Sequence, residues 1–152
     1  WGIAEDDMAD FFPGFIASDV FPSFDDARLG FPPNRSMEAL YYNADWLAEL
    51  GFEGPPTTPE EFKEMACAAV ENPFSGAVAD IPSQGYQFVF GASGMASWAF
   101  AHGGDIFDYE AGQYSYKDQE AVDAMHFSQY HYVDGCASLS TEQFVYQTDF
   151  GN

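Results

Sequence analysis

The sequence predicts an α/β fold, because segments with helical periodicity alternate along the chain with short segments typical of strands. Of its 152 residues, 47% are hydrophobic and 18% are aromatic, which is enough for a packed core. No apolar run approaches the roughly 20 residues that a membrane-spanning helix needs. No internal repeat or low-complexity block interrupts the alternation.

The first thirty residues are rich in aromatic and acidic side chains. Pro13 and Pro22 limit any helix there to short pieces, because proline lacks the N–H that a helix interior requires. Residues 30–34, Gly-Phe-Pro-Pro-Asn, predict a stiff extended connector, since the residue before a proline disfavours helix.

A strand and a short helix are predicted next. The apolar run Met37–Tyr42 predicts a buried strand. Asn43 is a good N-cap for a helix that continues through Leu50. Gly51 then stands where the left-handed residue after a helix is expected.

The strongest helix start in the sequence is the run Thr58-Pro59-Glu60-Glu61. It is typical of a capping box, with Thr at the cap, Pro at the first helical position and Glu at the third. The apolar residues that follow fall on one helix face: Phe62, Met65, Ala66, Ala69 and Val70. Asn72-Pro73 ends this helix.

The rest of the chain continues the alternation. The predicted elements are a loop over 73–84, a strand over 85–90, a turn at 91–94, a helix of small residues to His102, a β-hairpin over 105–117 around 110–112, and a helix from Asp118 to Gly135. The last helix has Ala121, Ala124, Met125 and Tyr132 among its apolar positions.

The charge balance excludes two classes of partner. The chain has 25 Asp and Glu against 4 Lys and Arg, a formal net charge of -21. Nucleic acid requires a basic surface that releases counterions, and an anionic membrane requires basic residues too. We therefore expect no nucleic-acid partner, and interpret the acidic residues chiefly as a solvated surface.

The cysteines and histidines do not form a metal motif. Cys67 and Cys136 are isolated, with no CxxC spacing, and the sequence alone leaves open whether they pair or are separate buried thiols. His126 and His131 lie at i and i+5, so they point to different helix faces, and His102 stands alone. No EF-hand spacing is present either. We expect no metal and no cofactor.

Enzyme motifs are incomplete. His102-Gly103-Gly104-Asp105 is similar to an esterase oxyanion loop, but no Gly-x-Ser-x-Gly follows it. We expect no catalytic residue. A carbohydrate-active hydrolase that uses paired carboxylates stays open as the alternative, because so many acids give some close pairs by chance. A third hypothesis is an adhesion module that makes contact through the aromatic-rich residues 105–116.

Several motifs in one order resemble extracellular solute-binding protein family 1, the sugar receptors of ABC importers. The matching runs are Gly30-Phe31-Pro32-Pro33, Ala39-Leu40-Tyr41-Tyr42-Asn43, Pro56-Thr57-Thr58-Pro59-Glu60-Glu61-Phe62, Trp98 with Ala101-His102-Gly103-Gly104-Asp105-Ile106, the helix 120–135, and Phe150-Gly151-Asn152. The Leu-Tyr-Tyr-Asn run is the most specific of them. The resemblance extends from about Arg28 to Asn152.

The resemblance implies a central fragment of a two-lobed periplasmic-binding-protein fold. Residues 1–30 would end the first lobe, 31–43 would form the hinge crossover strand, and 44–152 would form an incomplete second lobe. It also implies an extracellular or periplasmic protein, with any signal peptide or lipid anchor on a missing N-terminus. On that placement we expect Cys67 and Cys136 to form a disulfide.

The resemblance also implies where a ligand binds. The crossover contributes Asn34, Arg35 and Ser36, and the segment after the strand 85–90 contributes Ser93 and Trp98. For Arg35 the alternative is an ordinary ion pair, and for Trp98 it is core packing. The expected partners are a sugar or polyol and the membrane permease of the importer, with the receptor itself a monomer.

Overall fold

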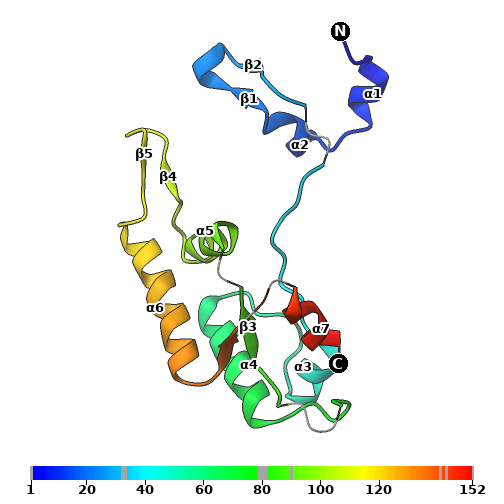
Figure 1. The fold of residues 1–152 in the computed structure, drawn as a ribbon, viewed down its shortest axis with the longest axis vertical. Helices are drawn as coiled ribbons and strands as arrows, with labels where there is room; N and C mark the ends of the chain where they lie inside the picture. Colours follow the sequence, from blue (N-terminus) through cyan, green and yellow to red (C-terminus); the bar gives the residue numbers. More distant parts are fainter. Residues whose placement is uncertain are drawn as a thin grey trace. The chain divides into compact units, whose positions relative to one another are not determined.

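The computed structural model describes residues 2–31, 34–78, 82–89, 91–140, 142 and 144–151. It is a mixed α/β structure with 45% helix, 10% strand and small sheets, in agreement with the predicted fold class. The chain divides into two compact units, Trp1–Met37 and Glu38–Asn152 (Figure 1). The boundary falls inside the segment 31–43, for which a hinge crossover stays a prediction.

The first unit contains only short elements, as its prolines predict. They are α1 (Glu5–Ala9), α2 (Pro13–Ala17), β1 (Val20–Phe21), the 3₁₀ helix η1 (Pro22–Phe24) and β2 (Ala27–Arg28). β1 and β2 pair antiparallel, with Val20 opposite Arg28. The Arg28 guanidinium also donates a hydrogen bond to the carbonyl of Ile16, which ties β2 to α2.

The predicted strand over Met37–Tyr42 is wrong. These residues have no regular secondary structure, and Met37 and Tyr41 are 83% and 79% exposed. A strand is stabilised by the hydrogen bonds of a neighbouring strand, and no strand in the described ranges pairs with this run. Apolar composition alone therefore does not produce the strand.

The helix α3 (Ala44–Glu49) follows the sequence signals closely. The Asn43 side chain accepts a hydrogen bond from the backbone N–H of Trp46 at 3.0 Å, as an N-cap should. Gly51 has a φ of 88°, the left-handed conformation that ends the helix. The indole N–H of Trp46 donates to the carbonyl of Asn72 at 2.9 Å, so α3 is joined to the end of the next helix.

The helix α4 (Pro59–Glu71) confirms the predicted start and stop. The Thr58 hydroxyl accepts from the backbone N–H of Glu61 at 3.1 Å. The Glu61 carboxylate departs from the expected box, because it accepts from both the hydroxyl and the backbone N–H of Thr57, each at 2.7 Å. The hydrogen bond from the Thr57 hydroxyl is the main cause that lowers the pKa of Glu61.

A parallel pair of strands organises the second unit. β3 (Tyr86–Phe88) lies beside β6 (Ala137–Leu139), with Tyr86 opposite Ala137. Parallel strands require a long crossover. Here it consists of α5 (Ala92–Ala101), β4 (Phe107–Asp108), β5 (Gln113–Tyr114) and α6 (Gln119–Val133), and the last helix is α7 (Val145–Gly151).

The sequence predicted most of these elements but not all. The antiparallel β4–β5 hairpin is confirmed, and its turn contains Gly112 with a φ of 65°. β3 is shorter than the predicted 85–90, in which residue 90 lies outside the described residues. α5 begins at Ala92, inside the predicted turn. Neither β6 nor α7 was predicted.

The core of the second unit is an aromatic cluster around Phe62. The rings of Tyr86 and Trp98 lie 4.9 and 5.1 Å from it, edge to face. Phe127 of α6 completes the contact, with its ring centroid 5.1 Å from that of Trp98. Ala66 and Cys136 are buried against this cluster. Phe62 therefore joins α4, β3, α5 and α6.

Apolar identity does not mark the buried face of α6. Ala121 and Ala124 are buried, but Met125 and Tyr132 are 48% and 53% exposed. The other residues buried on this helix are Ser128 and His131. α6 packs against α5, where the ring of Phe127 contacts that of Trp98. Helices in the described parts of the chain are all too short or too polar to cross a membrane.

Candidate functional site

An open polar depression lies at the end of the first unit. It has a volume of about 330 Å³ and is lined by Asn34, Arg35 and Ser36. These are the residues that the resemblance assigns to the crossover. Their amide, guanidinium and hydroxyl groups are donors and acceptors suited to a hydroxylated ligand. The three residues are consecutive in the chain, so their proximity follows from the sequence itself.

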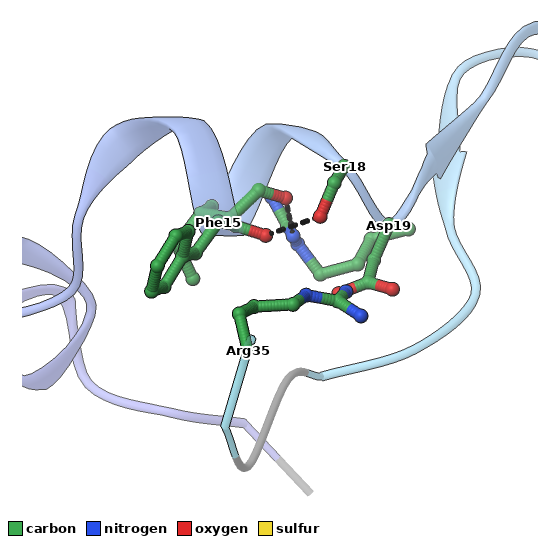
Figure 2. A network of polar contacts seen from close by, with 6 residues as sticks. Phe15, Ser18, Asp19 and Arg35 are labelled. Atoms are coloured by element: carbon green, nitrogen blue, oxygen red, sulfur yellow. Dashed lines mark hydrogen bonds and ion pairs between the residues drawn. The ribbon is translucent and has the colours of Figure 1, made fainter. Parts of the chain in front are cut away.

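Arg35 forms an ion pair inside the first unit. Its Nη2 lies 2.5 Å from Oδ2 of Asp19, which stands between α2 and β1 (Figure 2). The Asp19 side chain is only 17% exposed, whereas that of Arg35 is 36% exposed. The ion pair that was the alternative to a ligand role for Arg35 is therefore observed. A guanidinium has five N–H donors, and this bond uses one of them.

The segment that holds Asp19 is fixed by short-range contacts. The Ser18 hydroxyl donates to the carbonyl of Phe15 at 2.8 Å, and Ser18 ends α2 (Figure 2). Leu29 N–H donates to the Asp19 carbonyl at 3.1 Å. The carboxylate that orients Arg35 is thus itself positioned by the end of α2 and by the chain after β2.

Ser93 and Trp98 both belong to α5 of the second unit, but their surroundings differ. Ser93 is exposed in the first turn, and its carbonyl accepts from the Ser97 hydroxyl at 3.0 Å. Trp98 takes part in the aromatic cluster around Phe62. The structure favours the core-packing alternative for Trp98, because a sugar-stacking residue needs an open ring face.

Cys67 and Cys136 form a disulfide, as expected from the resemblance. Their Cα atoms are 4.5 Å apart, and the bridge joins α4 to the residue before β6. Cys136 is buried beside Phe62. Sequence spacing alone did not indicate this pairing.

His131 is a buried polar side chain that no motif of the sequence indicates. It is fully buried, and its Nδ1 donates to the carbonyl of Phe127 at 2.8 Å. Its Nε2 has no hydrogen-bond partner within the described residues. Burial lowers the pKa of His131 below the usual 6.5 and Lys63 acts in the same direction, against the Phe127 hydrogen bond and Asp134. His131 is therefore neutral at pH 7.

Two further observations limit the chemistry. No cluster of three or more His, Cys, Asp or Glu within the described ranges could hold a metal ion. A second, apolar depression of about 200 Å³ is lined by residues of α6 and β6. Its lining is Met125, Ser128, Gln129, Tyr132 and Leu139.

Comparison with known proteins gives no assignment: no family model, curated protein or solved structure matches the chain.

Proposed function

We propose that this chain belongs to an extracellular solute-binding receptor that delivers a sugar or polyol to an ABC importer. The observation that carries the proposal is the ordered series of motifs from about Arg28 to Asn152, in which Ala39-Leu40-Tyr41-Tyr42-Asn43 is the most specific. In the proposed full protein, two α/β lobes close on the ligand by a hinge movement. The crossover 31–43 connects them.

The α/β arrangement of the second unit supports this proposal. β3 and β6 are parallel, and ligands of open α/β sheets bind outside the carboxyl ends of parallel strands. Ser93 follows β3 at that end and is exposed in the first turn of α5. It is the residue of the second unit best suited to donate a hydrogen bond to the solute.

The disulfide supports the proposed compartment. Disulfides persist in oxidising environments such as the periplasm and the cell exterior, and are rare in the cytosol of most organisms. The Cys67–Cys136 bridge closes a sequence separation of 69 residues in the second unit. An exported receptor would form it after secretion.

The depression at Asn34, Arg35 and Ser36 supplies the proposed polar contacts of the first unit. Asp19 holds the Arg35 guanidinium in place, so fewer rotamers are lost when a ligand binds. The Asp19 carboxylate also balances the Arg35 charge, which suits a neutral, hydroxylated solute better than an anionic one.

The test is a thermal-shift screen of the product of the complete reading frame against neutral mono- and oligosaccharides and polyols. A ligand at about 100 times its dissociation constant adds about 2.7 kcal/mol to the free energy of unfolding. We expect one sugar class to raise the melting temperature without being consumed. Hydrolysis of that sugar would favour the hydrolase alternative, and a flat panel would remove carbohydrate from the proposal.

Arg35→Gln and Asp19→Asn separate a ligand contact from a structural role. If Arg35 donates to the solute, Arg35→Gln weakens binding by roughly tenfold or more, as expected for loss of a charged hydrogen bond. Asp19→Asn keeps the guanidinium donors and removes the carboxylate that holds them, so it should cost less affinity than Arg35→Gln. Equal losses in the two variants would mean that the ion pair acts through the fold alone.

A further inference from the structure

The β4–β5 hairpin carries a row of aromatic side chains on one face, here called the aromatic row. It consists of Phe107, Tyr109, Tyr114 and Tyr116. Phe107 is paired with Tyr114 across the strands, so these two side chains share a face. The ring of Phe107 contacts those of Tyr109 and Tyr114, and Tyr114 contacts Tyr116, with centroids 5.1 to 5.3 Å apart. The rings of Tyr114 and Tyr116 are stacked, with an angle of 7° between their planes.

The aromatic row faces solvent. Tyr109, Tyr114 and Tyr116 are 82%, 67% and 64% exposed. The adjacent Ser115 is buried instead, and its hydroxyl donates to the carbonyl of Asp105 at 2.7 Å. The hairpin thus turns its small polar residue inward and its tyrosines outward. Contiguous exposed aromatic surface of this kind marks an interaction site more often than a packing accident.

Hydrogen bonds fix the turn of the hairpin that carries these rings. Oδ1 of Asp108 accepts from the backbone N–H groups of Glu110 and Ala111, each at 2.9 Å. The N–H of Gly112 donates to the Asp108 carbonyl at 2.8 Å, and Gly112 adopts a left-handed φ. Rigid tyrosines lose little conformational entropy when a partner binds, which makes them effective contact residues.

The charges of residues 105–120 indicate which kind of partner the aromatic row attracts. Residues 105–120 contain the acids Asp105, Asp108, Glu110, Asp118 and Glu120 and one cation, Lys117. The whole chain has a net charge of -21, so a second copy of it is repelled. A cationic group is attracted both by the carboxylates and by the faces of the tyrosine rings.

We propose that the aromatic row binds an arginine-bearing segment of a partner protein. The planar guanidinium stacks on a tyrosine face, as arginine does more readily than lysine, and its charge is attracted by the acidic residues of the segment 105–120. The backbone of an extended peptide would follow the hairpin past successive rings. This contact is separate from the proposed solute site and does not depend on it.

The test titrates the 152-residue chain with the peptide acetyl-Arg-Gly-Arg-amide and with its citrulline analogue, which has the same shape and no charge. Backbone amide shifts are followed by NMR at about 150 mM salt, where long-range attraction is largely screened. We expect the arginine peptide to shift the amides of residues 105–117 and the citrulline peptide to bind at least about threefold more weakly. Equal binding of the two peptides would overturn the proposal.

Leucine variants separate the tyrosine faces from the general acidity of the chain. Tyr114→Leu with Tyr116→Leu should weaken the arginine peptide about threefold to tenfold, because cation–π contacts at exposed sites are individually modest. Tyr41→Leu is the matched control, since Tyr41 is 79% exposed, lies near Glu38 and stands outside the row. The same loss in the control, or shifts of the 105–117 amides with maltotetraose in place of the peptide, would contradict the proposal.

Discussion

The two units use aromatic residues in different ways. In the first unit the rings meet in isolated pairs, such as Phe11 with Phe31 at 4.7 Å and Phe12 with Phe15 at 5.5 Å. In the second unit Phe62 is surrounded by rings from three other elements. No described residue of the first unit is buried, whereas the second unit contains a core.

The difference shows that element length decides whether apolar residues become a core. α1 and α2 have 5 residues each, too few to cover a face, because prolines and turns interrupt them. α4 and α6 have 13 and 15 residues, and Phe127 of α6 packs against Trp98 of α5. The predictions below test whether stability is concentrated in the second unit as this comparison implies.

The largest expected effect is that of Phe62→Ala. It removes the ring that joins four elements and leaves a cavity, so we expect a loss of about 3–5 kcal/mol in the free energy of unfolding, measured by urea denaturation. Phe24→Ala in the first unit is the matched control. Phe24 is 58% exposed, and its loss should change the free energy by less than about 0.5 kcal/mol. Comparable losses would show that the first unit also depends on packing.

Replacing both cysteines by serine should have the next largest effect. The Cys67–Cys136 bridge restricts the unfolded chain, and its removal is expected to destabilise the second unit by about 2–4 kcal/mol. Hydrogen exchange should report the loss in residues 59–139 and not in residues 5–28. Dithiothreitol should reproduce it in the native chain and have no effect on the double variant; a response of the double variant would contradict the assignment.

Glycine-to-alanine substitutions compare how tightly the two units are packed at single positions. A Cβ at Gly85 would lie 1.9 Å from the carbonyl oxygen of Ala66 and 2.5 Å from that of Cys136, so the backbone must shift. We expect Gly85→Ala to lower the melting temperature by an amount equivalent to about 2–3 kcal/mol. Gly14→Ala, in α2 of the first unit, meets nothing within 4 Å and should be neutral or slightly stabilising.

The pH dependence of stability tests the buried histidine. Because the pKa of His131 is lower in the folded chain than its usual 6.5, the unfolded chain binds the proton first as the pH falls. The stabilisation from neutral His131 is present above about pH 6.5 and is lost as the pH falls toward the folded pKa. His131→Leu should therefore reduce the fall in melting temperature between about pH 7.5 and about pH 5.5.

His126→Leu is the control for the pH experiment, since His126 lies exposed on the same helix. If both variants flatten the curve equally, or neither does, burial of His131 does not govern the acid sensitivity.

Much of the fold could be predicted because its signals are local. The caps at Asn43 and Thr58 and the turn at Gly112 are each specified by a few neighbouring residues, and all three are present. The strand predicted over Met37–Tyr42 does not form, because a strand depends on a partner elsewhere in the chain. β6 was missed for the related reason that three residues, Ala137–Leu139, carry too little pattern to be distinguished from a loop.

The candidate site was less predictable than the fold. The sequence suggested both an ion pair and a ligand role for Arg35, and only the structure identifies Asp19 as its partner. Apolar identity does not mark the buried face of α6, because the buried residues include Ser128 and His131. The His131 ring contacts the rings of Phe62 and Phe127, and a hydropathy pattern does not report on such contacts.

The parallel pairing of β3 with β6 has a consequence for how fast the chain finds its native state. The two strands are separated in sequence by α5, the hairpin and α6, so a large loop must close before any of their ladder bonds forms. Cys136 immediately precedes β6. Its bond to Cys67 therefore keeps the residues of β6 close to those of α4 even when the chain is unfolded. Stopped-flow refolding should therefore be faster with the disulfide intact than after reduction, since the search for the strand partner is already shortened.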